Sequence, residues 1–138
     1  MNEFQLHERL AADTLGVGDF ALSRILLMND ARYPWVILVP RLPGARELHE
    51  LSRLDRIRLL DESGVVADCL ERLFRPDKLN LGVLGNLVPQ LHVHHVARCA
   101  GDPAWPGPVW GHSPAEPYPA ELAEERLAAL RGCLGLAA

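Results

Sequence analysis

The sequence predicts an α+β domain in which helices pack on an antiparallel β-sheet, and three observations lead to this prediction. Short apolar runs bounded by turn residues occur in two pairs. A long segment with helical spacing of its apolar residues lies between the pairs, and a shorter helical segment ends the chain. Because 138 residues suit one compact domain, we expect a single domain over residues 1–138.

The first pair of strands is a predicted β-hairpin. Apolar residues dominate residues 20–28 and 35–40, and a short polar segment beginning at Asn29 separates them. Pro40 ends the second strand, because proline has no N–H to donate to a β-ladder.

The longest predicted element is a helix that begins after Ser52 and ends before Pro76. Ser52 can accept a hydrogen bond from the first turn, and Asp55 stands three residues later as a capping-box partner. Apolar residues then follow at approximately helical spacing: Leu54, Ile57, Leu60, Val65, Leu70, Leu73 and Phe74.

The second pair of strands is predicted at residues 79–84 and 91–97, with a turn at Gly85-Asn86 between them. Residues 102–119 follow as an irregular arm, because they hold six of the eleven prolines and two of the three tryptophans, Trp105 and Trp110. These indoles either anchor the arm or reach over a site.

A C-terminal helix is predicted at about residues 119–132, with Gly132 as its stop.

Composition excludes several classes of partner. The net charge is −4 and the 14 Lys and Arg residues are scattered, so we expect no binding to nucleic acid polymers. The longest apolar runs fall far short of the ~20 residues of a membrane span, so we expect no membrane association. Three widely spaced cysteines fit neither a disulfide framework nor a zinc half-site, which favours a reducing compartment and a cytoplasmic protein.

Three of the six histidines fall within the predicted strand at residues 91–97. Side chains alternate across a strand, so Gln90, His92 and His94 are expected on one face, and His95 on the core face as a structural residue that needs hydrogen-bond partners. A neutral imidazole is a nucleophile, and neighbouring donors can bind phosphoryl oxygens or protonate a leaving group. This row therefore suits chemistry at a phosphorus atom, with His92 as the attacking residue.

Two other interpretations remain open for this cluster. A single histidine on a strand is more often structural than catalytic. For this cluster of histidines, the spacing alone gives the structural and the catalytic role equal weight. His92 and His94 could also ligate zinc from one face, but no carboxylate or thiolate stands nearby to complete the ligand set, so we predict no metal site.

Residues 85–98, GNLVPQLHVHHVAR, resemble the signature of the histidine triad (HIT) superfamily, with Gln90 in the place of the first histidine. The order of strands and the long helix extend the resemblance over residues 20–102, closest to the branch resembling dinucleoside polyphosphate hydrolases. It implies an antiparallel sheet of about five strands with one long central helix and a C-terminal helix. It also implies a homodimer.

The resemblance further implies a nucleotide hydrolase or nucleotidyl transferase that requires no cofactor. His92 matches the nucleophile that attacks the α-phosphorus of a nucleoside polyphosphate or phosphoramidate, and His94 matches a phosphate donor that can assist the leaving group. Asn86 stands where a phosphate contact is usual, and Asn29 where the ribose is bound, with the base near Leu27.

Four residues depart from the family pattern: Gln90, Trp35 in place of a further histidine, Leu87 in place of a hydroxyl residue, and His95 in place of a hydrophobic residue. These changes keep a second hypothesis open, that of a non-catalytic nucleotide-binding or interaction module.

Overall fold

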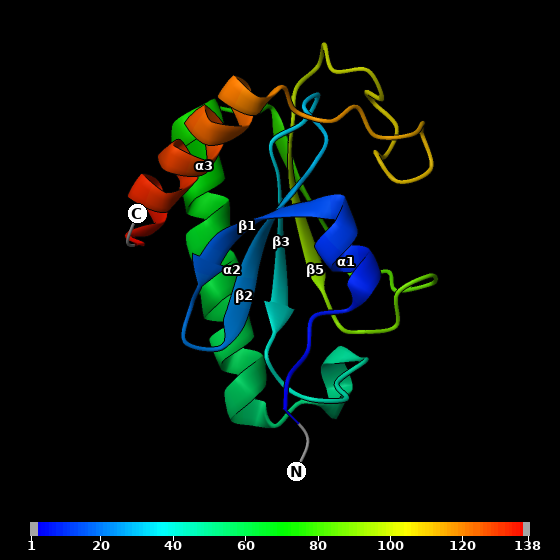
Figure 1. Cartoon of the computed structure of the whole chain (residues 1–138), viewed down its shortest axis with the longest axis vertical. Coiled ribbons are helices and arrows are strands. Elements are labelled where there is room, and N and C mark those ends of the chain that lie inside the picture. The colour runs from blue at the N-terminus through cyan, green and yellow to red at the C-terminus, as the bar shows by residue number, and fades with distance from the viewer. Residues whose placement is uncertain (1–2, 137–138) are drawn as a thin grey trace.

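The computed structural model describes residues 3–136 and confirms the predicted α+β fold (Figure 1). The predicted domain also included residues 1, 2, 137 and 138, which lie outside the described residues. Five strands form one sheet in the order β1-β2-β3-β5-β4, and all neighbouring strands are antiparallel. The strands are β1 (Thr14–Asp19), β2 (Ser23–Met28), β3 (Trp35–Pro40), β4 (Lys78–Gly82) and β5 (Val93–Arg98). The helices are α1 (Glu8–Asp13), the single-turn η1 (Leu48–Glu50), α2 (Arg53–Phe74) and α3 (Ala120–Leu134).

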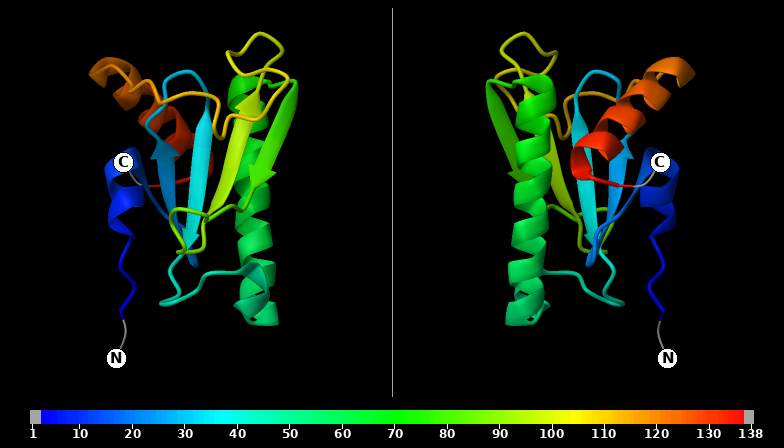
Figure 2. Two further views of the ribbon diagram at one scale, coloured as in Figure 1. Left: turned by 90° about the vertical axis from the view of Figure 1, so that its right-hand side faces the viewer. Right: turned by 90° about the vertical axis from the view of Figure 1, so that its left-hand side faces the viewer.

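Both faces of the sheet are covered, by different parts of the chain. Helices α2 and α3 cover one face, while α1 lies on the opposite side (Figure 2). Segments of the arm also pack on that second face through Ala104 and Val109. In β3, Val36 and Leu38 therefore face the helices, and Ile37 and Val39 face the second apolar cluster. This double burial explains why β3 is a continuous apolar run rather than an alternating one.

Helix α2 begins and ends as the sequence predicts. The Ser52 hydroxyl accepts a hydrogen bond of 3.1 Å from the backbone N–H of Asp55. At the other end, Arg75 adopts the left-handed conformation at φ 47°, immediately before Pro76. The predicted hairpin of β2 and β3 and the second pair of strands are also confirmed.

Several elements differ from the sequence-based predictions in their presence or their bounds. Strand β2 begins at Ser23 rather than at residue 20, and β4 covers Lys78–Gly82 rather than residues 79–84. Helix α1 and strand β1 were not predicted, because β1 contains two glycines and a register irregularity between Gly16 and Gly18 that obscures its alternation. Strand β5 begins at Val93 rather than at residue 91. Helix α3 passes Gly132 and ends at Leu134, with Gly135 (φ 72°) as its C-cap, because burial of Leu134 holds the last turn against the core.

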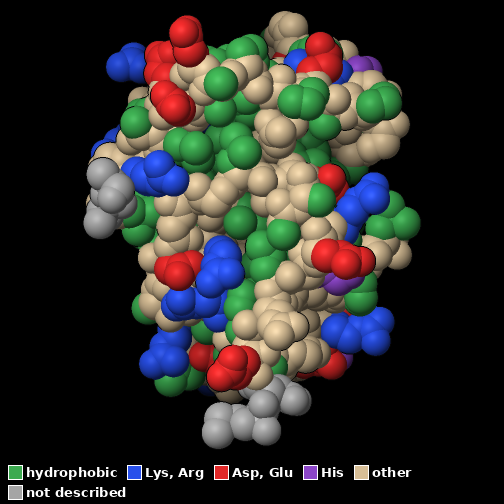
Figure 3. Space-filling model, viewed as in Figure 1, with side chains coloured by type: hydrophobic (Ala, Val, Ile, Leu, Met, Phe, Trp, Pro, Cys, Tyr) green, Lys and Arg blue, Asp and Glu red, His purple; other side chains and the backbone are tan. Residues whose placement is uncertain are grey.

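On the face shown in Figure 3, Lys and Arg side chains are interspersed with Asp and Glu side chains, and a few Lys and Arg side chains adjoin one another on its lower left. Within residues 3–136, no helix is both long and apolar enough to traverse a bilayer.

Candidate functional site

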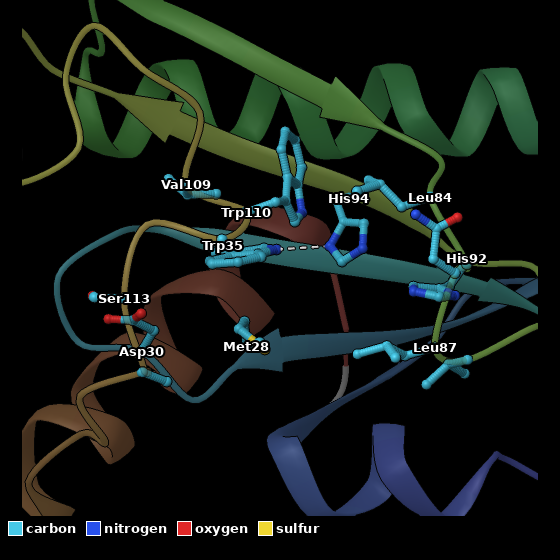
Figure 4. A pocket seen from close by; sticks show the side chains of 15 residues that line it. Met28, Asp30, Trp35, Leu84, Leu87, His92, His94, Val109, Trp110 and Ser113 are labelled. Carbon is cyan, nitrogen blue, oxygen red and sulfur yellow. Dashed lines mark hydrogen bonds between the residues drawn. The ribbon is translucent and has the colours of Figure 1, made fainter.

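A pocket of about 440 Å³ opens where the start of β5 meets the end of β2, the start of β3 and the arm (Figure 4). The loop that connects β4 to β5 forms another part of its wall. The lining residues that carry polar or aromatic side chains are Asp30, Trp35, Asn86, His92, His94, Trp110 and Ser113. The arm therefore supplies part of the wall, and the chain between β4 and β5 supplies another part.

His92 occupies the position immediately before β5, and its ring lines the pocket. Its Nδ1 lies 2.7 Å from the backbone oxygen of Gln90. A carbonyl oxygen only accepts hydrogen bonds, so Nδ1 carries the proton and donates it. Nε2 of the neutral ring therefore holds an unshared electron pair, as a nucleophile requires.

His94 lies in β5 and has the opposite arrangement. Its Nδ1 lies 2.9 Å from Nε1 of Trp35. An indole N–H only donates, so Nδ1 of His94 is the acceptor and the proton of the neutral ring is on Nε2. Burial lowers the pKa of His94 to about 3, and the neighbouring His92 contributes to the same shift, so the ring is neutral at pH 7.

The two rings lie side by side, with centroids 4.9 Å apart and planes at 67°. Within residues 3–136, neither Nε2 atom has a hydrogen-bond partner. The pair therefore presents one unshared electron pair and one N–H donor to whatever occupies the pocket. The described pocket lining contains no Lys or Arg, and the carboxylate of Asp30 is paired with Arg32 at 2.9 Å. An anion in this pocket would be held by neutral donors rather than by cations.

Gln90 does not join the two histidines in the pocket. Its Oε1 accepts a hydrogen bond of 2.8 Å from the backbone N–H of His7, and its Nε2 donates one of 2.9 Å to the backbone oxygen of Gln5. Strand alternation, on which the sequence argument rested, begins only at Val93, so it does not apply to residue 90. The contribution of Gln90 to the site is the backbone oxygen that orients His92.

The two predicted asparagines are separated. Asn86 lines the pocket, on the loop between β4 and β5. Asn29 does not line the pocket, and its Oδ1 accepts a hydrogen bond of 3.0 Å from the backbone N–H of Tyr118. Leu27, near which the base was expected, is buried on the opposite face of the sheet, against α2 and α3, and Met28 lines the pocket instead.

Trp110 brings the arm into the site. Its ring packs edge-to-face on His94 at 5.4 Å and on Trp35 at 6.2 Å between centroids. The ring also lies against Gly82, where a Cβ atom would come within 2.9 Å of the indole. Trp105, in contrast, lies outside the pocket, with the Arg98 guanidinium 5.8 Å from its ring centroid.

The sequence argument left the position of Trp110 open and did not identify Asp30 or Ser113 as pocket residues. The proline-rich composition of residues 102–119 predicted an irregular arm, but it did not predict which of the arm's side chains would line the pocket. The tryptophan content of the arm was the available signal, because large rigid rings commonly close pockets.

His95 has the structural role that the sequence predicts. Its Nδ1 donates to the backbone oxygen of Val36 at 3.2 Å, so its Nε2 accepts from the Ser63 hydroxyl at 2.6 Å. Burial lowers its pKa to about 4, against the opposing effect of backbone hydrogen bonds. The ring thus joins β3 and β5 to α2 on the face away from the pocket. In residues 3–136, no group of three or more His, Cys, Asp or Glu side chains is arranged to hold a metal ion.

Comparisons with known proteins converge on one family. The model of the HIT domain matches residues 9–101. A histidine triad protein from Marinobacter aquaeolei VT8 is 52% identical, with a TM-score of 0.95 over 97% of this chain and 98% of that one. A histidine triad protein from Bradyrhizobium japonicum is 44% identical, with a TM-score of 0.94 over 96% and 99% of the two chains. One from Sinorhizobium meliloti 1021 is 46% identical, with a TM-score of 0.91 over 94% and 96%. Comparison with the curated proteins found no match.

Proposed function

Because the chain belongs to the HIT domain family, we propose that it binds a nucleotide in the pocket at His92 and His94 and cleaves it at the α-phosphorus. The observation that carries this proposal is the opposite hydrogen-bond arrangement of two adjacent histidines: Nδ1 of His92 faces a carbonyl oxygen, whereas Nδ1 of His94 faces an indole N–H. Transfer of a nucleotidyl group needs a nucleophile for phosphorus and a donor for the phosphoryl oxygens, and this pair supplies both.

The proposed reaction has two steps. First, the unshared pair on Nε2 of His92 forms a bond to the α-phosphorus, while the bond from phosphorus to the leaving group breaks and its electron pair departs with that group. The backbone oxygen of Gln90, 2.7 Å from Nδ1, stabilises the positive charge that develops on the ring. Second, water attacks phosphorus, the N–P bond breaks, its electron pair returns to Nε2, and a water proton is released. The product is a nucleoside monophosphate, and no cofactor enters either step.

The same proposal assigns the remaining pocket residues to the nucleotide. Trp110, Met28 and Val109 form an apolar wall suited to a base. Asn86 contacts the phosphate, as the family resemblance implies. Asn29 lies outside the pocket lining and its Oδ1 accepts one hydrogen bond from the Tyr118 N–H, so the ribose contact that the resemblance implies would use its amide NH₂ or the second lone pair of Oδ1.

Two substrate groups fit the chemistry, nucleoside phosphoramidates and dinucleoside polyphosphates. The described lining has no cation that would neutralise the further phosphates of a polyphosphate. We therefore favour a substrate with one phosphate and an uncharged or cationic leaving group over the dinucleoside polyphosphate suggested by the sequence.

A substrate panel tests this function. Purified protein is incubated with nucleoside phosphoramidates, dinucleoside polyphosphates and nucleotide sugars, and release of a nucleoside monophosphate is measured. We expect His92→Ala to abolish turnover with little loss of nucleotide affinity. The matched control is His49→Ala, which replaces an exposed histidine on η1. Turnover of every cleaved substrate at wild-type rates by His92→Ala would disprove the mechanism.

One observation favours the alternative of a non-catalytic nucleotide-binding or interaction module. Gln90, in the place of the first triad histidine, has its side chain committed to the backbone of residues 5 and 7. It therefore cannot take part in proton transfer within the pocket. Nucleotide affinity in a calorimetric titration, together with no product across the whole panel, would support this alternative.

We also propose a homodimer built on β4 and α2. Strand β4 is an edge of the sheet, and a shallow apolar hollow of about 380 Å³ lies between it and α2. Leu60 of α2 is 71% exposed, and Leu81 of β4 is 53% exposed. A second copy would cover both the unpaired edge and these side chains. Sedimentation should therefore give a dimer that Leu60→Asp converts to monomer. A monomeric wild-type protein at micromolar concentration would refute the dimer.

A further inference from the structure

Trp35 occupies a special position relative to His94. Residue 37 of β3 pairs with His94 of β5, and Trp35 lies two residues earlier on the same face. Diagonal neighbours in an antiparallel pair are close enough for large side chains to meet. The indole N–H therefore reaches Nδ1 of His94 at 2.9 Å, with both side chains buried at the inner wall of the pocket (Figure 4).

We propose that Trp35 is a positioning residue that locks His94 in the neutral Nε2–H form, so that His94 donates a hydrogen bond to the substrate phosphate but transfers no proton during cleavage. This inference rests on the proposed function and assigns a narrower role to His94 than the family resemblance implies. It also limits the substrates to those whose leaving group departs without a proton from His94.

The lock follows from hydrogen-bond chemistry. To deliver a proton, His94 would first have to become an imidazolium, with protons on both ring nitrogens. Its Nδ1–H would then face the Trp35 N–H across 2.9 Å, and two donors in that position repel each other. Burial opposes the charged ring as well, and the adjacent His92 opposes it further. The remaining route, loss of the Nε2 proton from a neutral imidazole, would create an anion in the same buried site.

The leaving group must therefore depart as an anion, take its proton from water, or carry that proton before cleavage. Rates of such reactions depend steeply on the basicity of the leaving group, because no acid neutralises its developing charge. The inferred substrates are accordingly nucleotidyl compounds with weakly basic leaving groups, such as acyl or aryl esters of a nucleoside monophosphate, or phosphoramidates whose nitrogen is already protonated.

Trp110 provides an internal comparison. It also packs on His94, at 5.4 Å between centroids, but its buried Nε1–H has no hydrogen-bond partner among residues 3–136. Loss of its indole would remove a packing contact with His94 while leaving the Nδ1 hydrogen bond intact. Substitution of Trp110 therefore tests the effect of packing on His94, and substitution of Trp35 tests the effect of the hydrogen bond to its Nδ1.

The first test is ¹⁵N NMR of the histidine side chains, which distinguishes protonated from unprotonated ring nitrogens and requires no substrate. We expect His94 to show an unprotonated Nδ1 and a protonated Nε2 from pH 8 to pH 5, in wild type and in Trp110→Phe. In Trp35→Phe we expect a mixture of tautomers. If Trp35→Phe fails to fold, Trp35→benzothienylalanine replaces only the N–H by sulfur. A protonated Nδ1 in the wild type, or an unchanged His94 in both Trp35 variants, overturns the lock.

The second test is kinetic and uses nucleoside monophosphate aryl esters whose phenols span several pKa values. In the wild type, we expect kcat/KM to fall about tenfold or more over two units of phenol pKa, and Trp110→Phe to keep that slope. A flat dependence that becomes steep in His94→Gln would show that His94 protonates the leaving group, and would overturn the inference. If NMR supports the lock but neither the esters nor the substrate panel yields a nucleoside monophosphate, the proposed function fails while the lock stands.

Discussion

Lowering the pH from 7 to 5 should destabilise this protein through two buried histidines, His94 and His95. Burial lowers their pKa values from 6.5 to about 3 and about 4 in the folded state. Below pH 6.5 the unfolded chain therefore binds protons that the folded chain does not. The contribution of these two histidines to the free energy of unfolding is fully present above pH 6.5. It declines as the pH falls toward their two folded-state pKa values.

The size of the loss depends mainly on the unfolded state. At pH 5 an unfolded histidine of pKa 6.5 is almost fully protonated, whereas both folded rings remain largely neutral. The difference costs about 2 kcal/mol per histidine between pH 7 and pH 5, or about 4 kcal/mol for the pair. That is a large share of the ~5–15 kcal/mol by which most domains are stable.

Urea unfolding monitored by tryptophan fluorescence, at one protein concentration and at both pH values, measures this loss. His94→Gln and His95→Gln should each remove about 2 kcal/mol of the pH dependence, whatever they do to stability at pH 7. His49→Gln replaces an exposed histidine on η1 and serves as the matched control variant. If the double variant at residues 94 and 95 loses as much stability at pH 5 as the wild type, the two histidines are not the cause.

Three further perturbations have defined outcomes. Gly82→Ala puts a Cβ 2.9 Å from the Trp110 ring, so nucleotide affinity measured by calorimetry should fall several-fold and folding should lose about 1–3 kcal/mol. Unchanged affinity would show that the ring is not part of the binding wall. Asp102→Ala leaves the buried guanidinium of Arg98 without its bidentate partner and should cost about 3–5 kcal/mol in urea unfolding, whereas a loss below 1 kcal/mol would contradict the pairing. Ser52→Ala removes the cap of α2 and should lower stability by about 1 kcal/mol, and no change in the unfolding midpoint would contradict the cap.

Elements with strong local signals could be predicted from the sequence. Helix α2 has a capping serine, a long helical pattern and a proline after its end, and each acts within a few residues. Strand β1 lacked such a signal, because Gly16 and Gly18 supply no side chains to alternate. The end of α3 was misplaced because Leu134, two residues beyond Gly132, is fixed by contacts with the distant core.

Site residues were predicted where the motif itself sets the geometry. His92 and His94 lie together as expected, since two residues of spacing near a strand keep them on one side. The partners of Gln90 and Asn29 are 83 to 89 residues away in sequence, on the N-terminal segment and the arm. No local pattern encodes such contacts. The Trp35–His94 hydrogen bond is similar, because it depends on the register between β3 and β5.

The double attachment of Gln90 couples the N-terminal segment to the ring of His92. The side-chain amide of Gln90 hydrogen-bonds to the backbone of residues 5 and 7, while its backbone carbonyl oxygen orients the His92 ring. A fusion partner or affinity tag that draws the N-terminal segment away would remove both partners of the Gln90 amide and loosen the peptide next to His92. Rates measured before and after removal of such a tag would test this coupling.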